Sequence, residues 1–262
     1  KTQENIRAEK LHIADTIGEQ GALYLNGDDP MLQQLRESYT GKIVWYGMES
    51  DCDYRAVNID TVKDCTRFEL HAPFGAHKIM IPALGLHNVS NALAAIAVAY
   101  DQGLTLDDIR CGLLTYEGLA MRQQIHELDK VTVIDDSDSA SPDSIKSGIG
   151  VLMAVKSTGK KIAVLADMLE LGERSAQAHL ELGAYAAASG VDAVVTVGRE
   201  AEKIAEGAVE ESRKILVKAC GTNDEAFAEL EKILNDGDCV LVKGSRGMHT
   251  DEIVQKLLTK YQ

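Results

Sequence analysis

Five apolar segments alternate with helical segments from residue 131 onward, and no other feature of the sequence constrains the fold as strongly. The segments are short and rich in Val, Ile, Leu and Ala, as expected of strands that are buried on both faces. Such alternation with helices is typical of a parallel sheet covered on both sides. The predicted strands are VTVID (131–135), KIAVLAD (161–167), DAVVTVG (192–198), KILVKA (214–219) and CVLVKG (239–244). Helices are predicted at 142–155, 175–189, 199–212, 223–235 and 249–260.

The first part of the chain has a different pattern. A loose apolar stripe predicts a helix over residues 2–18, and three β-rich segments predict an antiparallel ribbon with a turn at Phe74–Gly75. Two pairs have the spacing of helix capping boxes, namely Thr105 with Asp108 and Thr222 with Glu225. We place a domain boundary near residues 119–122. The other predicted elements are strands at 22–26 and 42–47, helices at 30–38, 88–103 and after Thr105, and the ribbon segments YRAVNIDTV, CTRFELHAP and HKIMIPAL.

The composition argues against several classes of function. The formal net charge of −14 repels nucleic acid and anionic membranes at long range. No apolar stretch approaches the roughly 18 residues of a membrane helix, and the charged start KTQENIRAEK is not a signal peptide. Because this start also lacks Met, we expect the chain to be part of a longer protein. Scattered cysteines without a CxxC pair indicate reduced thiols in the cytoplasm: Cys52, Cys65, Cys111, Cys220 and Cys239.

The stretch VIDDSDSASPDS follows the first predicted strand of the parallel sheet. Ligands of such sheets gather beyond the carboxyl ends of the strands. Carboxylates there can hold Mg²⁺ or bind ribose, and a glycine-containing turn before a helix can cradle an anion. Asp and Ser are also favoured as helix caps and turn formers, so the residues alone leave both interpretations open. The residues concerned are Asp135, Asp136, Asp138, Asp167 and the KGSRG turn (243–247).

Several strings, in register along the whole chain, resemble the Mur ligase family. GLHNVSNALAAIAVAYDQG (85–103) is similar to the helix that follows its ATP-binding core, and IDDSDSASPDS (134–144) to the signature loop of its last domain. VLADMLELGERSAQAHLELG, LVKGSRGMHTDEIV, ENIRAEKLHI and LNGDDP resemble the MurF type, the branch that adds D-alanyl-D-alanine. The resemblance implies an α/β fold. Residues 1–121 would be the back part of a central ATP-binding domain with an antiparallel β segment, and residues 122–262 a C-terminal Rossmann-like domain with a parallel sheet.

The resemblance also implies a reaction. Mur ligases join an amine to a peptide carboxylate with ATP and Mg²⁺, through an acyl phosphate. For the MurF type the substrates are UDP-N-acetylmuramoyl-tripeptide and D-alanyl-D-alanine, and the product is a cytoplasmic peptidoglycan precursor. We expect a monomer without nucleic-acid or membrane partners. The family's ATP loop GTNGKT does not occur in the sequence, so we predict that these 262 residues alone do not ligate.

Candidate site residues follow from the positions that match the family's motifs. Lys10 matches a lysine that relatives carbamylate, and only as a carbamate would it act in catalysis and help to hold Mg²⁺. Asn88 and Asn91, on one helix face, match asparagines near the adenine. Arg122 and Asp136 match residues that contact ATP. The expected substrate-binding residues are Ser137, Asp138, Ser139, Ser141, Asp143 and Asp167.

The signature loop departs from the family pattern. Relatives usually read DDSYNANPDS, whereas this chain has Asp138 in place of Tyr, and Ser139 and Ser141 in place of Asn. Met121 replaces a glycine before the arginine. Three hypotheses stay open: a ligase for D-alanyl-D-alanine, a ligase for another amine that pairs with Asp138, and a degenerate homologue that binds or regulates. A dinucleotide-dependent redox enzyme is disfavoured because no GxGxxG follows a strand.

Overall fold

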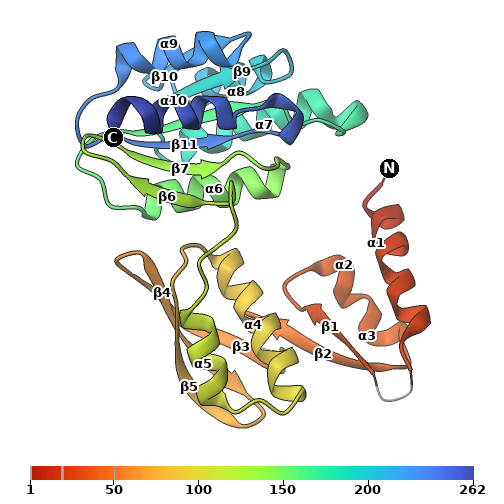
Figure 1. Ribbon diagram of the computed structural model, residues 1–262. Coiled ribbons are helices and arrows are strands. Elements are labelled where there is room, and N and C mark those ends of the chain that lie inside the picture. The colour runs from red at the N-terminus through yellow and green to blue at the C-terminus, as the bar shows by residue number, and fades with distance from the viewer. Residues whose placement is uncertain (1, 19–20, 50) are drawn as a thin grey trace. The chain divides into compact units, whose positions relative to one another are not determined.

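The computed structural model describes residues 2–18, 21–49 and 51–262 (Figure 1). The chain divides into two compact units between Glu117 and Gly118. The boundary predicted from the sequence lies slightly later, near residues 119–122. Each unit has its own sheet and its own hydrophobic core.

The second unit is built on a six-stranded sheet in the order β10-β9-β8-β11-β7-β6. Every neighbouring pair is parallel except β6 with β7. The five predicted strands are present, which confirms the predicted α/β fold with a parallel sheet. The sequence does not predict the antiparallel edge strand β6, because the short segment QIHE has no strand pattern of its own. The bounds are β6 (Gln124–Glu127), β7 (Thr132–Asp136), β8 (Lys161–Ala166), β9 (Ala193–Val197), β10 (Leu216–Cys220) and β11 (Cys239–Lys243).

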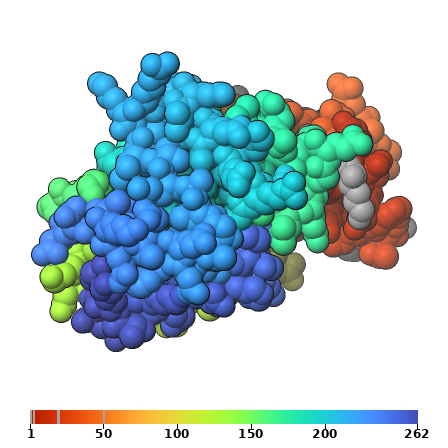
Figure 2. Space-filling view, turned by 90° about the horizontal axis from the view of Figure 1, so that it is seen from above, coloured from red at the N-terminus to blue at the C-terminus, as the bar shows by residue number. Residues whose placement is uncertain are grey.

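Helices cover both faces of this sheet (Figure 1). Side chains of α9 and α10, such as Leu230 and Leu257, share one core cluster with alternate strand residues such as Val164 and Val242. Because successive strand residues point to opposite faces, the intervening residues face α6, α7 and α8. Figure 2 shows α9 and α10, in blue and dark blue, side by side on one surface. The bounds are α6 (Pro142–Ala154), α7 (Ser175–Ala188), α8 (Glu202–Glu211), α9 (Asn223–Ile233) and α10 (Asp251–Tyr261).

Helices α7 and α8 pack closely through a glycine on each of them. A Cβ atom at Gly183 would lie 1.9 Å from the carbonyl oxygen of Ile204. A Cβ atom at Gly207 would lie 2.0 Å from the carbonyl oxygen of Leu180. Atoms in protein interiors are close-packed but do not overlap in this way, so both positions require glycine.

Polar side chains begin two helices of this unit. Ser141 caps α6, and it forms a reciprocal capping box with Ser144. The capping box predicted for Thr222 and Glu225 is only half formed. Thr222 accepts a hydrogen bond from the N–H of Glu225 as expected. The Glu225 carboxylate instead accepts a hydrogen bond from the N–H of Gly221, one residue before the cap, at 2.7 Å.

The first unit has a five-stranded sheet in the order β1-β2-β3-β4-β5. The β1–β2 and β2–β3 pairs are parallel, while β3, β4 and β5 form the predicted antiparallel ribbon. Helix α4 packs on β1, β2 and β3, and α5 packs on β5. Thr105 and Asp108 form the predicted capping box at the start of α5. The bounds are β1 (Ala22–Asn26), β2 (Lys42–Gly47), β3 (Tyr54–Val62), β4 (Cys65–Ala72), β5 (Gly75–Ile81), α4 (Leu86–Asp101) and α5 (Leu106–Leu114).

Two helices of the first unit differ from the prediction. The helix expected over residues 2–18 is α1 (Gln3–Leu11) followed by a 3₁₀ helix (His12–Thr16). The Thr16 hydroxyl donates to the carbonyl of Ile13 at 3.0 Å, and such local bonds compete with a continued α-helix. The helix expected over residues 30–38 is divided into α2 (Pro30–Gln33) and α3 (Leu35–Ser38). Among the residues that the structure describes, no helix is long and apolar enough to cross a membrane.

Candidate functional site

Most of the predicted site residues gather at one edge of the sheet of the second unit. At this edge β7, β8 and β11 end and β6 begins, because β6 runs antiparallel to β7. Ligands of open parallel sheets bind beyond such carboxyl ends. The residues that the fold brings to this edge are Arg122, Asp136, Ser137, Asp138, Ser139, Ser141, Asp143 and Asp167.

A buried ion pair joins the ends of β7 and β11. The ammonium Nζ of Lys243 lies 2.8 Å from Oδ2 of Asp136, and the two side chains are 3% and 8% exposed. Lys243 also donates to the carbonyl oxygen of Ser139 at 2.8 Å. One lysine therefore anchors both the strand end and the loop that follows it. Lys243 lies in the KGSRG turn that the sequence indicates as a possible anion site, but it is not among the predicted site residues.

Asp138 lies between two arginines. Its Oδ2 is 2.7 Å from Nη2 of Arg122, and its Oδ1 accepts hydrogen bonds from Nη2 and, at 3.0 Å, from Nε of Arg246. The hydrogen bond from Arg246, and then the charge of Arg122, lower the pKa of the Asp138 carboxyl, against the opposing effect of its burial. Both carboxylate oxygens are thus occupied within the protein. Arg246 was not among the predicted residues, although it lies in the KGSRG turn.

Backbone strain flanks Arg122 on both sides. Met121 and Gln123 have φ angles of +60° and +53°, in the left-handed region that residues other than glycine rarely adopt. The N–H of Asp138 donates to the carbonyl oxygen of Met121 at 3.1 Å, which ties this segment to the loop after β7. Each such residue costs about 1–3 kcal/mol, and such strain concentrates at functional sites. Met121 therefore keeps the conformation that suits the glycine it replaces.

Other predicted residues have structural partners, as the interpretation as caps and turns expects. Oδ1 of Asp135 accepts from the N–H and the hydroxyl of Ser137, at 3.1 and 2.6 Å. Oδ1 of Asp167 accepts from the N–H of Ala201 at 2.7 Å, just before α8. Ser141 caps α6, and Asp143 is exposed in the first turn of the same helix.

The loop after β8 is fixed by two side chains that were not predicted. His179 is fully buried, and its Nε2 accepts from the N–H of Met168 at 3.0 Å. Its Nδ1 lies 2.8 Å from the carbonyl oxygen of Ser175. The hydroxyl of Ser245 accepts from the N–H of Leu169 at 2.9 Å. Sequence patterns do not reveal these contacts, because each joins the loop to a distant or helical residue.

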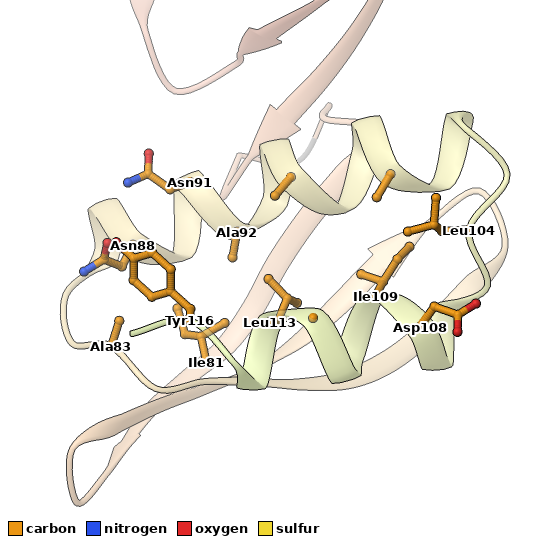
Figure 3. A pocket seen from close by; sticks show the side chains of 13 residues that line it. Ile81, Ala83, Asn88, Asn91, Ala92, Leu104, Asp108, Ile109, Leu113 and Tyr116 are labelled. Carbon is orange, nitrogen blue, oxygen red and sulfur yellow. The ribbon is translucent and has the colours of Figure 1, made fainter. Parts of the chain in front are cut away.

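A groove between α4 and α5 contains the predicted asparagines of the first unit (Figure 3). It has a volume of about 380 Å³, and most of the side chains that line it are apolar. Asn88 and Tyr116 lie at one end in Figure 3, and Leu104 and Asp108 lie at the other. The amide nitrogen of Asn88 donates to the carbonyl oxygen of Leu84 at 2.8 Å, which fixes the side chain. Asn91 is exposed and points away from α5 (Figure 3).

Lys10 lies apart from this groove. It is exposed in the last turn of α1 and does not line the groove. Across residues 2–18, 21–49 and 51–262, no group of three or more His, Cys, Asp or Glu side chains is placed to hold a metal ion.

Two protein-family models match the chain and show which family it belongs to. Residues 1–99 match the Mur ligase middle domain, and residues 121–246 match the Mur ligase domain described as the glutamate ligase domain. The chain belongs to the Mur ligase family. This confirms the resemblance that its loops and helices suggested.

Individual relatives point to one branch of the Mur ligases. The UDP-N-acetylmuramoyl-tripeptide–D-alanyl-D-alanine ligase of Bacillus subtilis is 33% identical over 98% of this chain and 55% of its own length. A crystal structure of MurF from Acinetobacter baumannii superposes with a TM-score of 0.87 at 30% identity, over 99% of this chain and 56% of that one. MurF from Thermotoga maritima in complex with ADP superposes with a TM-score of 0.85 at 25% identity, over 99% of this chain and 58% of that one. The chain thus spans about half the length of the Mur ligases it matches.

Proposed function

We propose that the protein containing this chain is an ATP-dependent ligase that adds D-alanyl-D-alanine to UDP-N-acetylmuramoyl-tripeptide during peptidoglycan precursor synthesis. Relatives named for this activity align along nearly the whole chain. The observation that carries the proposal is the gathering of Arg122, Asp136 and the loop 137–141 at the carboxyl edge of the second sheet. Ligands of open parallel sheets bind at this edge.

The proposed reaction has two steps. A carboxylate oxygen of the peptide attacks the γ-phosphorus of ATP, the bond to the β–γ bridging oxygen breaks, and ADP leaves. The amino group of D-alanyl-D-alanine then attacks the carbonyl carbon of the acyl phosphate and releases phosphate and a proton. The phosphoryl group stays anionic, so a fixed guanidinium beside it stabilises the transition state. We assign this role to Arg122, which is half-exposed and held by Asp138.

The groove between α4 and α5 supports the proposed use of ATP. Its apolar walls suit a purine ring, and the Asn88 amide at one end offers polar atoms to the edge of a base. The role predicted for Asn91 stays a proposal, and its side chain points away from α5. The relative from Thermotoga maritima was solved with ADP. Mg²⁺ stays a prediction and no step is assigned to it, because the described residues form no cluster of metal ligands. Magnesium is commonly bound through substrate phosphates and only one or two carboxylates.

Several smaller assignments also stay proposals. Lys10 would act in catalysis only as a carbamate, and its exposure leaves the amine accessible to carbon dioxide. A monomeric cytoplasmic protein is expected from the family. The proposed residues for binding the acceptor are Ser137, Ser139, Ser141, Asp143 and Asp167, and Asp138 would act only through the two arginines that it holds. Of these, Asp167 also accepts from the N–H of Ala201, and Ser137 donates its N–H and hydroxyl to Asp135.

A ligase for a cationic acceptor is the second candidate, and the contacts of Asp138 count against it. That hypothesis needs the Asp138 carboxylate to pair with the incoming amine. Both of its oxygens already bind guanidinium groups, those of Arg122 and Arg246. A cationic amine would have to displace one of them. The departure from the family's tyrosine is therefore better explained as an internal counter-ion.

Phosphate release by the natural protein, with all the residues that flank this sequence, tests the proposal. The protein is given ATP, Mg²⁺, UDP-N-acetylmuramoyl-tripeptide and D-alanyl-D-alanine, and each component is omitted in turn. We expect phosphate release only with the complete mixture. Mass spectrometry should show a product heavier than the UDP-linked tripeptide by one D-alanyl-D-alanine less one water. Release that needs no dipeptide, or no release at all, contradicts the proposal.

A further inference from the structure

The cluster of Arg122, Asp138 and Arg246 has one buried and two exposed members. The side chain of Asp138 is 9% exposed, whereas those of Arg122 and Arg246 are 54% and 77% exposed. Within this cluster, two guanidinium charges face one carboxylate, which leaves one positive charge. The whole chain has a formal net charge of −14. An acidic protein binds an anion through such a local positive charge.

The contacts of Arg246 leave part of its guanidinium group facing away from Asp138. Nε and Nη2 donate to Oδ1 of Asp138, and this uses one side of the planar group. A guanidinium group has five N–H donors in a fixed fork, so the edge formed by the two Nη atoms keeps donors for a second acceptor. Asp138 thus holds the Nε–Nη2 side of the guanidinium and leaves the Nη1–Nη2 edge outside this contact.

We propose that Arg246 binds an oxyanion of a substrate, with Asp138 as its positioning residue. The inference rests on the proposed ligase function, which supplies two sources of such an anion: the carboxylate of the dipeptide acceptor and a phosphate of the nucleotide. Both accept two parallel hydrogen bonds from a guanidinium edge. Because Asp138 already orients the side chain, less conformational entropy is lost on binding. The position is consistent with the ligand edge of the sheet, since Arg246 follows β11 closely.

Steady-state kinetics of the natural protein distinguish the two sources. The variants are Arg246→Gln and Arg246→Lys, with Arg213→Gln as a matched control, because Arg213 is exposed and precedes β10 at the opposite edge of the sheet. If the anion is the dipeptide carboxylate, Arg246→Gln raises the KM for D-alanyl-D-alanine about tenfold or more, as expected for losing a charged hydrogen bond. The KM for the C-terminal amide of the dipeptide does not change.

If the anion is a phosphate, Arg246→Gln raises the KM for ATP instead, and acid and amide acceptors respond alike. Arg246→Lys falls between the wild type and Arg246→Gln, because it keeps the charge and loses the planar fork. Asp138→Asn raises the same KM as Arg246→Gln but by a smaller factor, and it also lowers kcat, because Asp138 holds Arg122 as well. An Asp138→Asn variant that leaves that KM unchanged would contradict the positioning role, whatever its kcat.

A binding measurement separates this inference from the proposed function. The side-chain Nε–H resonance of Arg246 in the 262-residue chain is assigned through Arg246→Gln and followed by NMR. D-alanyl-D-alanine, its amide and inorganic phosphate are added separately. We expect the dipeptide acid or phosphate to shift the resonance and the amide to leave it in place. No shift with any anion, together with unchanged KM values in a protein that ligates, overturns the inference alone. A shift in a protein that does not ligate refutes the proposed function and leaves the anion site standing.

Discussion

The ammonium of Lys243 lies 2.8 Å from the carboxylate of Asp136, and both side chains are nearly buried between the ends of β11 and β7. Lys243→Met removes the ammonium group beside the buried carboxylate of Asp136 and the donor to the carbonyl of Ser139. Breaking a buried pair in this way costs about 3–5 kcal/mol of the free energy of unfolding. Lys130→Met is the control: Lys130 pairs with Asp236 at 3.7 Å, both are largely exposed, and such a pair contributes about 0–1 kcal/mol.

Urea unfolding can assign this loss to the second unit. The chain has one tryptophan, Trp45, which lies in the first unit. Its fluorescence therefore follows the first unit, while far-UV circular dichroism follows both. We expect Lys243→Met to shift a dichroism transition and leave the fluorescence transition unchanged. Equal, small effects of Lys243→Met and Lys130→Met would show that the buried pair does not stabilise the unit.

The glycines between α7 and α8 give a second prediction. Gly183→Ala places a methyl group 1.9 Å from the carbonyl oxygen of Ile204, so the helices must separate. We expect a loss of about 1–3 kcal/mol in the free energy of unfolding, as for other overpacked sites. Gly150→Ala is the matched control, because a Cβ atom there meets no atom within 4 Å on α6. That change should stabilise by about 0.5–1 kcal/mol. If both substitutions change the free energy of unfolding in the same direction, the close contact between α7 and α8 is contradicted.

The contacts of Asp138 predict a dependence of stability on pH. Its folded-state pKa lies below the ordinary value of 3.8, chiefly because Arg246 donates a hydrogen bond to the carboxylate. The unfolded chain therefore binds a proton first as the pH falls. The stabilisation is present in full above about pH 4 and is lost as the pH falls through the lower, folded-state pKa. Urea midpoints of the wild type and Asp138→Asn should differ most at pH 5 and converge towards pH 2. A constant difference across that range would contradict the paired carboxylate.

Buried His179 should keep one tautomer. Because the N–H of Met168 donates to Nε2, that nitrogen carries no proton, and Nδ1 donates to the carbonyl oxygen of Ser175. The ¹⁵N chemical shifts of the ring should show an unprotonated Nε2 and a protonated Nδ1. His179→Leu leaves the Met168 N–H without its acceptor and should cost about 1–3 kcal/mol. Shifts that indicate a protonated Nε2 would mean that the loop after β8 is held in another way.

The fold of the second unit could be predicted because its signals are local. Apolar strands such as residues 161–167, and the helices between them, can be recognised from single segments of the sequence. The edge strand β6 could not be predicted, because its four residues have no strand pattern of their own. It forms by pairing with β7, for example Ile125 with Ile134. The helix expected over residues 2–18 is an α-helix only as far as Leu11, and a 3₁₀ helix follows it.

The candidate site was predictable in position and less so in its contacts. The carboxyl edge of the sheet collects Asp136 and Asp138 by topology alone. Their partners come from elsewhere, since Arg246 is 108 residues away from Asp138 in the chain. Only the folded arrangement reveals that Asp138 is a counter-ion within the protein rather than an open acceptor of a cationic ligand. The catalytic role of Lys10 and its carbamylation stay predictions.

The most direct test of the central claim follows one oxygen atom. If a peptide carboxylate attacks ATP and an amine then displaces phosphate, one carboxylate oxygen leaves with the phosphate. The natural protein is given ATP, D-alanyl-D-alanine and UDP-N-acetylmuramoyl-tripeptide labelled with ¹⁸O in its terminal carboxylate. The account predicts one ¹⁸O in each phosphate released and one amide bond formed for each phosphate. Phosphate without the label, or labelled phosphate without the amide product, would contradict ligation through an acyl phosphate.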